Sequence, residues 1–154
     1  MQPRFGAERL DMKECADFFE GALRCHVLSI GLLGPGLPDW NVAQSVLSGK
    51  QSYQWLDFEI PAVTWLSPTE RRRVGKMVRL ALSVGGAAVQ AAAIEARQLA
   101  TVFTSSSGDG DNCHAIFSTL AHTVKSERFI SPTRFHNSVH NAPAGYWSIA
   151  NQCT

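Results

Sequence analysis

The order of its segments predicts an α/β fold for this chain of 154 residues. Two short apolar runs, 26–33 and 99–105, are typical of buried strands because each leads into a loop rich in glycine or serine. Apolar residues recur at helical spacing over 67–96 and again over 112–125. Strands that alternate with helices in this way indicate a sheet flanked by helices.

Residues 1–25 precede the first strand and are expected to form an appendage. Asp11 can cap a short amphipathic helix that extends to Leu23. Its apolar stripe comprises Met12, Cys15, Phe18, Phe19 and Leu23. The chain is therefore divided into an appendage over 1–25 and a single domain over 26–154.

A short helix is expected after the first strand. Asp39 is a good N-cap for this helix, and Gly49 suits its C-terminal end because glycine adopts positive φ without strain. Three apolar residues are expected on its inner face: Val42, Val46 and Leu47. The residues that follow, 50–66, are mixed in character and predict an extended connection.

The long helix has the clearest start in the sequence. Ser67 can cap it, Pro68 suits its first position, and Glu70 completes a capping box. Its middle contains Gly85 and Gly86, and each glycine costs about 1 kcal/mol relative to alanine inside a helix. Such a pair is tolerated where a neighbour must approach closely, so we expect tight packing against this helix.

A loop rich in serine and glycine, 105–110, follows the second strand. Such a loop before a helix can bind phosphate through its backbone N–H groups, but Asp109 and Asp111 would repel an anion. A simple turn is therefore favoured. Asn112 is expected to cap the next helix. The inner face of that helix is expected to carry Ile116, Leu120 and Val124.

Charge and hydropathy exclude several functional classes. The formal net charge is +1, so nothing indicates a nucleic-acid partner or an anionic membrane surface. The basic run Arg71–Arg73 is short and fits a solvated helix face. No segment reaches the roughly 18 apolar residues of a membrane span, and no signal peptide is recognisable. A cytoplasmic location is expected.

Neither the cysteines nor the histidines predict a metal site. The cysteines are widely spaced and form no C-x-x-C pair, so free thiols are expected. His136 and His140 have the spacing of half a metal site on a helix. No glutamate accompanies them, however, and Pro143 interrupts a regular helix. No metal or other cofactor is therefore expected.

The segment 129–154 is the most distinctive part of the sequence. A Ser131-Pro132 helix start is followed by Asn141, Ala144 and Gly145 in an Asn-x-x-Ala-Gly pattern. This arrangement resembles the N-terminal half of β-ketoacyl synthases, the condensing enzymes of fatty-acid and polyketide assembly. The resemblance implies a thiolase-like fold with a sheet flanked by helices. It also implies that the chain holds the first half only and is truncated before the nucleophile turn.

The amino-acid sequence of residues 136–149 most resembles that of the short ketosynthase-like proteins of aryl polyene and xanthomonadin-type pigment clusters. Some of these proteins lack the nucleophile and resemble chain-length factors, which are inactive partners of a working ketosynthase. The resemblance therefore implies a ketosynthase subunit, or a second copy of this chain, as the partner. An acyl carrier protein is implied only indirectly.

Site residues follow from the same resemblance. In condensing-enzyme dimers this segment lies at the two-fold interface and helps to close the partner's acyl channel. Carried over, the residues that would face a partner are Phe135, His136, Asn137, Ser138, His140, Asn141 and Tyr146. The alternative, that they fill the domain's own core, stays open. No catalytic residue is assigned, because Cys153 falls ahead of the position of the family's cysteine.

Three functions remain open for the chain. The first is a non-catalytic subunit of chain-length-factor type, and the second is an N-terminal fragment of an active β-ketoacyl synthase, which is an acyltransferase. The third is a free-standing α/β binding module. In the family the strand after Ile149 lies in the middle of a sheet. Without that strand, the isolated chain is expected to dimerise, aggregate or be marginally stable.

Overall fold

The computed structural model describes residues 25–153, and this part of the chain is helical. Its α-helices are α1 (Trp40–Leu47), α2 (Pro68–Arg73), α3 (Lys76–Ala92), α4 (Gly110–His122), α5 (Pro132–Ser138) and α6 (Ala142–Asn151). Two single turns of 3₁₀ helix are η2 (Ala96–Gln98) and η3 (Lys125–Glu127). The helix expected over 11–23 lies outside the described residues. Within them, no helix combines the length and the apolar character needed to span a membrane.

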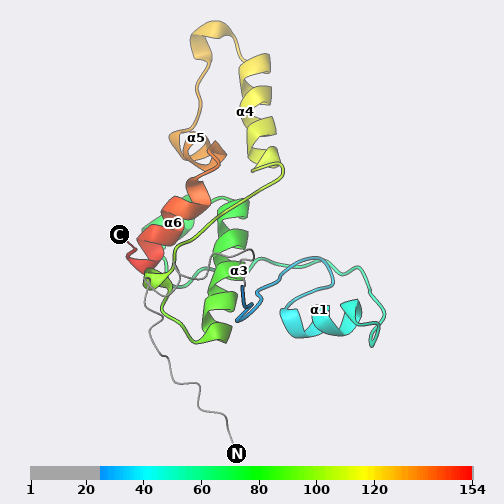
Figure 1. Cartoon of the computed structure of the whole chain (residues 1–154). Helices are drawn as coiled ribbons and strands as arrows, with labels where there is room; N and C mark the ends of the chain where they lie inside the picture. The colour runs from blue at the N-terminus through cyan, green and yellow to red at the C-terminus, as the bar shows by residue number, and fades with distance from the viewer. Residues whose placement is uncertain (1–24, 154) are drawn as a thin grey trace, which may run out of the picture.

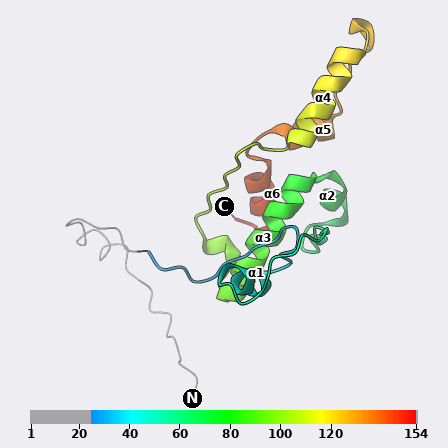
Figure 2. The ribbon, with the colours of Figure 1, turned by 90° about the vertical axis from the view of Figure 1, so that its right-hand side faces the viewer.

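The helices are arranged around the pair α3 and α6, which pack against each other (Figure 1). Helices α4 and α5 also contact each other, and together they project from this pair as an arm. The view turned by 90° shows the same arm extending away from α3 and α6 (Figure 2). Helix α1 lies at the opposite end of the molecule from α5. The α5–α6 junction connects the arm to the part of the chain around α3 and α6, which we call the body.

The two predicted strands are not formed in the described part of the chain. Residues 26–33 and 99–105 are irregular there, and the single β-bridge joins Gly34 to Leu37. Val102, in the middle of the second run, is 88% exposed. A strand requires a neighbour whose backbone groups complete its hydrogen bonds, and residues 25–153 supply none to these runs. The sheet flanked by helices is therefore not confirmed.

The predicted long helix starts as expected but is divided into α2 and α3. The hydroxyl of Ser67 accepts a hydrogen bond from the N–H of Glu70 at 3.2 Å, which confirms the predicted cap. Helix α2 ends at Arg73, since Val74 is extended, and α3 starts after Gly75. A side chain distant in sequence, described below, holds this break.

The glycine pair of α3 accommodates two indole rings. A Cβ atom at Gly85 would lie 2.6 Å from Cζ3 of Trp147, and one at Gly86 would lie 3.0 Å from Cζ2 of Trp65. The two rings meet edge to face with their centroids 5.7 Å apart. Close approach to the glycines is therefore confirmed, although the neighbours are side chains of the same chain. The buried core comprises Val63, Leu66, Val78, Leu82, Ala142, Tyr146 and Trp147.

The start of α1 agrees with the prediction, and its inner face does not. Asp39 caps the helix by accepting a hydrogen bond from the N–H of Val42 at 2.9 Å, and Gly49 adopts φ +72° just beyond its end. The prediction that Leu47 faces inward is wrong, because its side chain is exposed. Ala43 is the fully buried residue of this helix.

Helix α4 begins earlier and ends earlier than predicted. Its N-cap is Asp109, whose Oδ1 accepts a hydrogen bond from the N–H of Asn112 at 3.1 Å, so the assignment of Asn112 as the cap is wrong. The helix ends at His122. Val124 therefore lies beyond it and is exposed, contrary to the expectation that it faces inward.

Candidate functional site

The segment between α5 and α6 turns sharply, and this turn positions the candidate site residues. Ser131 and Pro132 start α5, and Asn141 precedes α6, as the sequence predicts. Helix α5 ends at Ser138, since Val139 is extended at φ −83° and ψ 140°. His136 and His140 therefore lie on different elements instead of on one helix face. Among residues 25–153 no group of metal-ligating side chains is large enough to hold an ion.

Asn137 is buried in the chain's own interior and joins α5 to the break between α2 and α3. Its side chain is 8% exposed. Its Nδ2 donates hydrogen bonds to the backbone oxygens of Arg73 at 2.7 Å and Thr133 at 2.8 Å. Its Oδ1 accepts a hydrogen bond from the N–H of Gly75 at 2.8 Å. The bonds to Arg73 and Gly75 satisfy backbone groups that the break in the helix would otherwise leave unpaired, and the bond to Thr133 lies within α5 itself.

Tyr146 is also buried within the chain, at 3% exposure. Its ring meets that of His136 edge to face, with centroids 5.5 Å apart. Burial raises the pKa of Tyr146 above its usual value; the negative charge of Glu70 raises this pKa further, and the positive charge of Arg73 opposes the increase. The phenol thus remains neutral over the physiological range and serves as a packing surface for His136.

The remaining candidate residues are accessible from outside the chain. Phe135 is 61% exposed, and His136, His140 and Asn141 are exposed as well. Ser138 is half-buried, and its hydroxyl donates a hydrogen bond to the backbone oxygen of Phe135 at 2.7 Å. The structure thus divides the candidate residues into buried ones that hold the segment and exposed ones that a partner can reach.

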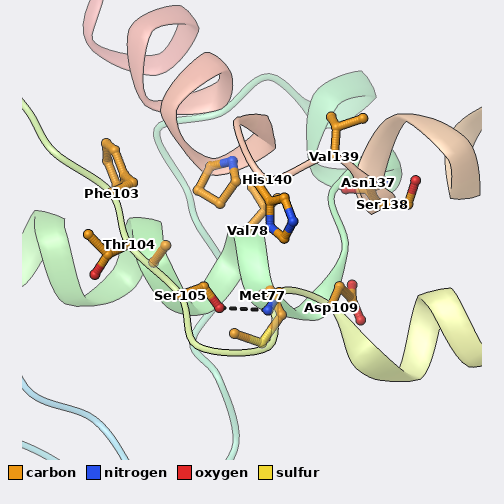
Figure 3. A pocket seen from close by; sticks show the side chains of 13 residues that line it. Met77, Val78, Phe103, Thr104, Ser105, Asp109, Asn137, Ser138, Val139 and His140 are labelled. Carbon is orange, nitrogen blue, oxygen red and sulfur yellow. Dashed lines mark hydrogen bonds between the residues drawn. The ribbon is translucent and has the colours of Figure 1, made fainter.

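A cavity of about 340 Å³ lies beside this junction (Figure 3). The start of α3, the segment 103–109 and the α5–α6 turn form its walls. The lining residues are Met77, Val78, Ala81, Phe103, Thr104, Ser105, Gly108, Asp109, Asn137, Ser138, Val139, His140 and Pro143. His140 lies over the loop that contains Gly108, and its ring is 3.3 Å from the position of a Cβ on that glycine.

None of the cysteines in the described part lies in the surroundings that a condensing nucleophile requires. Such a thiolate needs a turn that presents it together with oxyanion donors. Cys113 lies inside α4 and Cys25 is exposed in an irregular segment. The thiol of Cys153, just after α6, contacts the backbone oxygen of Ala96 at 3.8 Å.

Sequence reasoning missed the structural role of Asn137 and most of the cavity. Asn137 bonds to backbone groups more than 60 positions earlier in the chain, and no local pattern indicates such a contact. The cavity combines three segments that are also distant in sequence. The one local signal is Gly108, whose φ of +59° fits its place in the tight loop beneath His140.

One family model matches the chain, that of the β-ketoacyl synthase N-terminal domain, over residues 45–154. The matched range starts within α1 and includes the whole cavity and both helices of the junction. No curated protein and no solved structure matches the chain.

Proposed function

The chain belongs to the β-ketoacyl synthase family through its N-terminal domain, and from this we propose that it is a non-catalytic subunit of chain-length-factor type. In this role it pairs with an active β-ketoacyl synthase in the cytoplasm. The pair acts in fatty-acid or polyketide-type biosynthesis, of which aryl polyene assembly is the proposed case. The chain's contribution is to help shape the acyl channel of its partner.

The observation that carries this proposal is an exposed aromatic residue on α5, a helix attached firmly to the rest of the chain. Phe135, a large apolar residue, is 61% exposed on α5, and two hydrogen bonds of Asn137 join this helix to the break between α2 and α3. Because the backbone of α5 is already ordered, binding of a partner there has a smaller entropic cost, and aromatic residues that become buried are frequent anchors of interfaces. His136, His140 and Asn141 are exposed in the same α5–α6 segment and can supply polar contacts for the rim of such an interface.

Two apolar runs support a partner of related fold. Residues 26–33 and 99–105 have the composition of buried strands but make no strand pairing within the described chain. Exposed apolar runs with unpaired backbone groups are templates for strand addition. We therefore place both runs in a sheet that forms when the partner is bound.

The cavity supports the acyl-channel part of the proposal. Its inner lining is apolar and comes from Met77, Val78, Ala81 and Phe103. It lies directly beside the α5–α6 turn, so a partner docked on α5 would lie next to its opening. The catalytic thiolate and imidazoles belong to the partner in this proposal, because none of the described cysteines occupies a nucleophile turn.

A native pull-down from the protein's own cells tests this proposal. We expect the tagged chain to recover a full-length ketosynthase at about equal stoichiometry, identified by mass. Phe135→Glu places a charge in the proposed interface and should abolish recovery. Lys50→Glu changes an exposed residue beyond α1, at the far end of the molecule from α5, and should leave recovery intact.

Recovery of the chain without a ketosynthase would overturn the pairing. An intact mass of the native protein well above 16.8 kDa, with a cysteine turn in the added sequence, would favour an active synthase instead.

A further inference from the structure

The cavity beside the α5–α6 turn has an apolar inner part of defined size. Val78 is fully buried there, and Met77, Ala81, Phe103 and Pro143 are half-buried around it. The cavity volume is about 340 Å³. An apolar cavity of about 150 Å³ accommodates benzene. The space therefore suits one ring with a short chain, and it is small for a larger ligand.

The opening of the cavity is polar. Ser105, Thr104 and His140 are exposed, in contrast to the apolar residues deeper inside. The Oγ of Ser105 accepts a hydrogen bond from the N–H of Gly108 at 2.8 Å, so its own O–H remains able to donate. The exposed ring of His140 lies over the same loop, 3.3 Å from the position of a Cβ on Gly108. A ligand that enters with its apolar end first would place a polar group between these side chains.

The charges around the opening select the kind of polar group. Among residues 25–153, no lysine or arginine lines the cavity, and Asp109 is the one acidic residue that does. One oxygen of Asp109 caps α4, and the positive end of the helix dipole partly offsets the carboxylate charge. An anionic group would be repelled without a counter-charge, whereas a hydroxyl group can both donate to Asp109 and accept from Ser105.

We infer that this cavity binds a small neutral amphiphile, a single ring or short carbon chain that carries a hydroxyl group. The apolar part lies against Met77, Val78 and Phe103, and the hydroxyl lies at the opening between Ser105, Asp109 and His140. This inference names a ligand class for the same cavity that the proposed function places beside the partner's acyl channel, and it goes beyond that function because the site is formed within one chain and needs no partner.

Methionine-methyl NMR tests the site directly, with 4-propylphenol as the probe. Met77 lines the cavity and is the one methionine among residues 25–153. Titration of the full chain should shift the Met77 methyl signal saturably. Propylbenzene, which lacks the hydroxyl, and 4-propylbenzoate, which is anionic, should each bind about tenfold more weakly, the effect of about one hydrogen bond or one unpaired charge.

Two variants should block the site from different sides. Ala81→Leu fills the inner part, and Thr104→Phe covers the opening from an exposed position, so one of them keeps its fold even if the other does not. Ala91→Leu, on an exposed position of the same helix, is the matched control and should bind as the wild type does. Circular dichroism verifies the helix content of each variant.

Three results would each overturn the inference: no saturable shift of Met77, a shift that persists in both blocked variants, or equal affinity for 4-propylbenzoate and 4-propylphenol. Because the titration uses the chain alone, its failure leaves the pairing with a ketosynthase untouched. Failure of the pull-down likewise leaves this site standing.

Discussion

At the scale of single residues, Asn137 and Tyr146 hold the α5–α6 segment while their neighbours remain accessible. Asn137 pairs with backbone groups of α2, of the break before α3 and of its own helix α5, and Tyr146 provides the surface on which His136 packs. Both are buried, so a change in either acts through the fold of the segment. Phe135 and His140 are exposed, so their substitution should leave the fold intact. A change at Phe135 should weaken partner binding, and a change at His140 should weaken ligand binding in the cavity.

Asn137→Ala should lower the free energy of unfolding by about 2 kcal/mol, because it removes two partly buried hydrogen bonds and leaves the backbone groups of Arg73 and Gly75 without these partners. Chemical denaturation measures the change. Asn141→Ala is the matched control, since Asn141 is exposed and makes no cap bond through its side chain. Its effect should stay within about 0.5 kcal/mol. Equal effects of the two substitutions would contradict the role assigned to Asn137.

The raised pKa of Tyr146 predicts that the chain loses stability at alkaline pH. Burial raises the pKa of Tyr146 in the folded chain, so the unfolded chain releases this proton first once the pH exceeds about 10. The free energy of unfolding therefore falls as the pH rises from about 10 through the folded-state pKa. Tyr146→Phe should reduce this fall, measured by denaturation between about pH 8 and 11. Tyr53→Phe, at a half-exposed position, is the control and should keep the wild-type slope.

At the scale of elements, α3 is the helix on which the body depends. Its glycines receive Trp147 and Trp65, its start lines the cavity, and it packs along α6. Ser29, in the irregular segment before α1, also donates a hydrogen bond to the backbone oxygen of Ala88 at 2.6 Å. The two glycines thus lower the helix propensity in the middle of α3 but allow the indole rings to pack closely against it.

Gly85→Ala and Gly145→Ala should change stability in opposite directions. A Cβ at Gly85 would lie 2.6 Å from the Trp147 ring, so overpacking should outweigh the gain in helix propensity and cost about 1–2 kcal/mol. Gly145 lies in α6 with open space around it, so alanine there should stabilise by up to about 1 kcal/mol. A thermal melt of both variants measures the difference. Stabilisation by Gly85→Ala would contradict the packing described for α3.

The starts of α1, α2 and α5 could be predicted from sequence because the residues that determine them are adjacent. Asp39, Ser67 and Pro132 are examples, since each cap or first-turn residue acts within three positions. The break at Gly75 could not be predicted, because the side chain that satisfies it is Asn137. The run 99–105 has the composition of a strand, but a strand also needs a neighbour, which composition does not specify.

At the scale of the whole molecule, the described chain leaves much apolar side chain exposed. Large apolar residues are exposed on irregular segments and on the arm, among them Val27, Trp55, Val102, Phe117 and Phe129. Soluble monomers rarely expose extensive contiguous apolar surface, because it promotes association. This exposure agrees with a subunit whose sheet and interface are completed by another chain.

The isolated chain should therefore self-associate or melt at low temperature. Sedimentation velocity over a range of concentrations should show species larger than a monomer. Val102→Lys, at a fully exposed position in the apolar run 99–105, should shift the distribution toward the monomer without loss of helix content. Lys50→Glu should leave it unchanged. A concentration-independent monomer with a high Tm would refute this expectation.

Amide hydrogen exchange on the chain alone and on the complex recovered from its cells tests the central claim most directly. We predict that residues 26–33 and 99–105 exchange rapidly in the isolated chain, since their backbone groups lack strand partners. In the complex both runs should become strongly protected, as central strands are. Protection in the isolated chain, or rapid exchange that persists in the complex, would contradict a sheet completed by the partner.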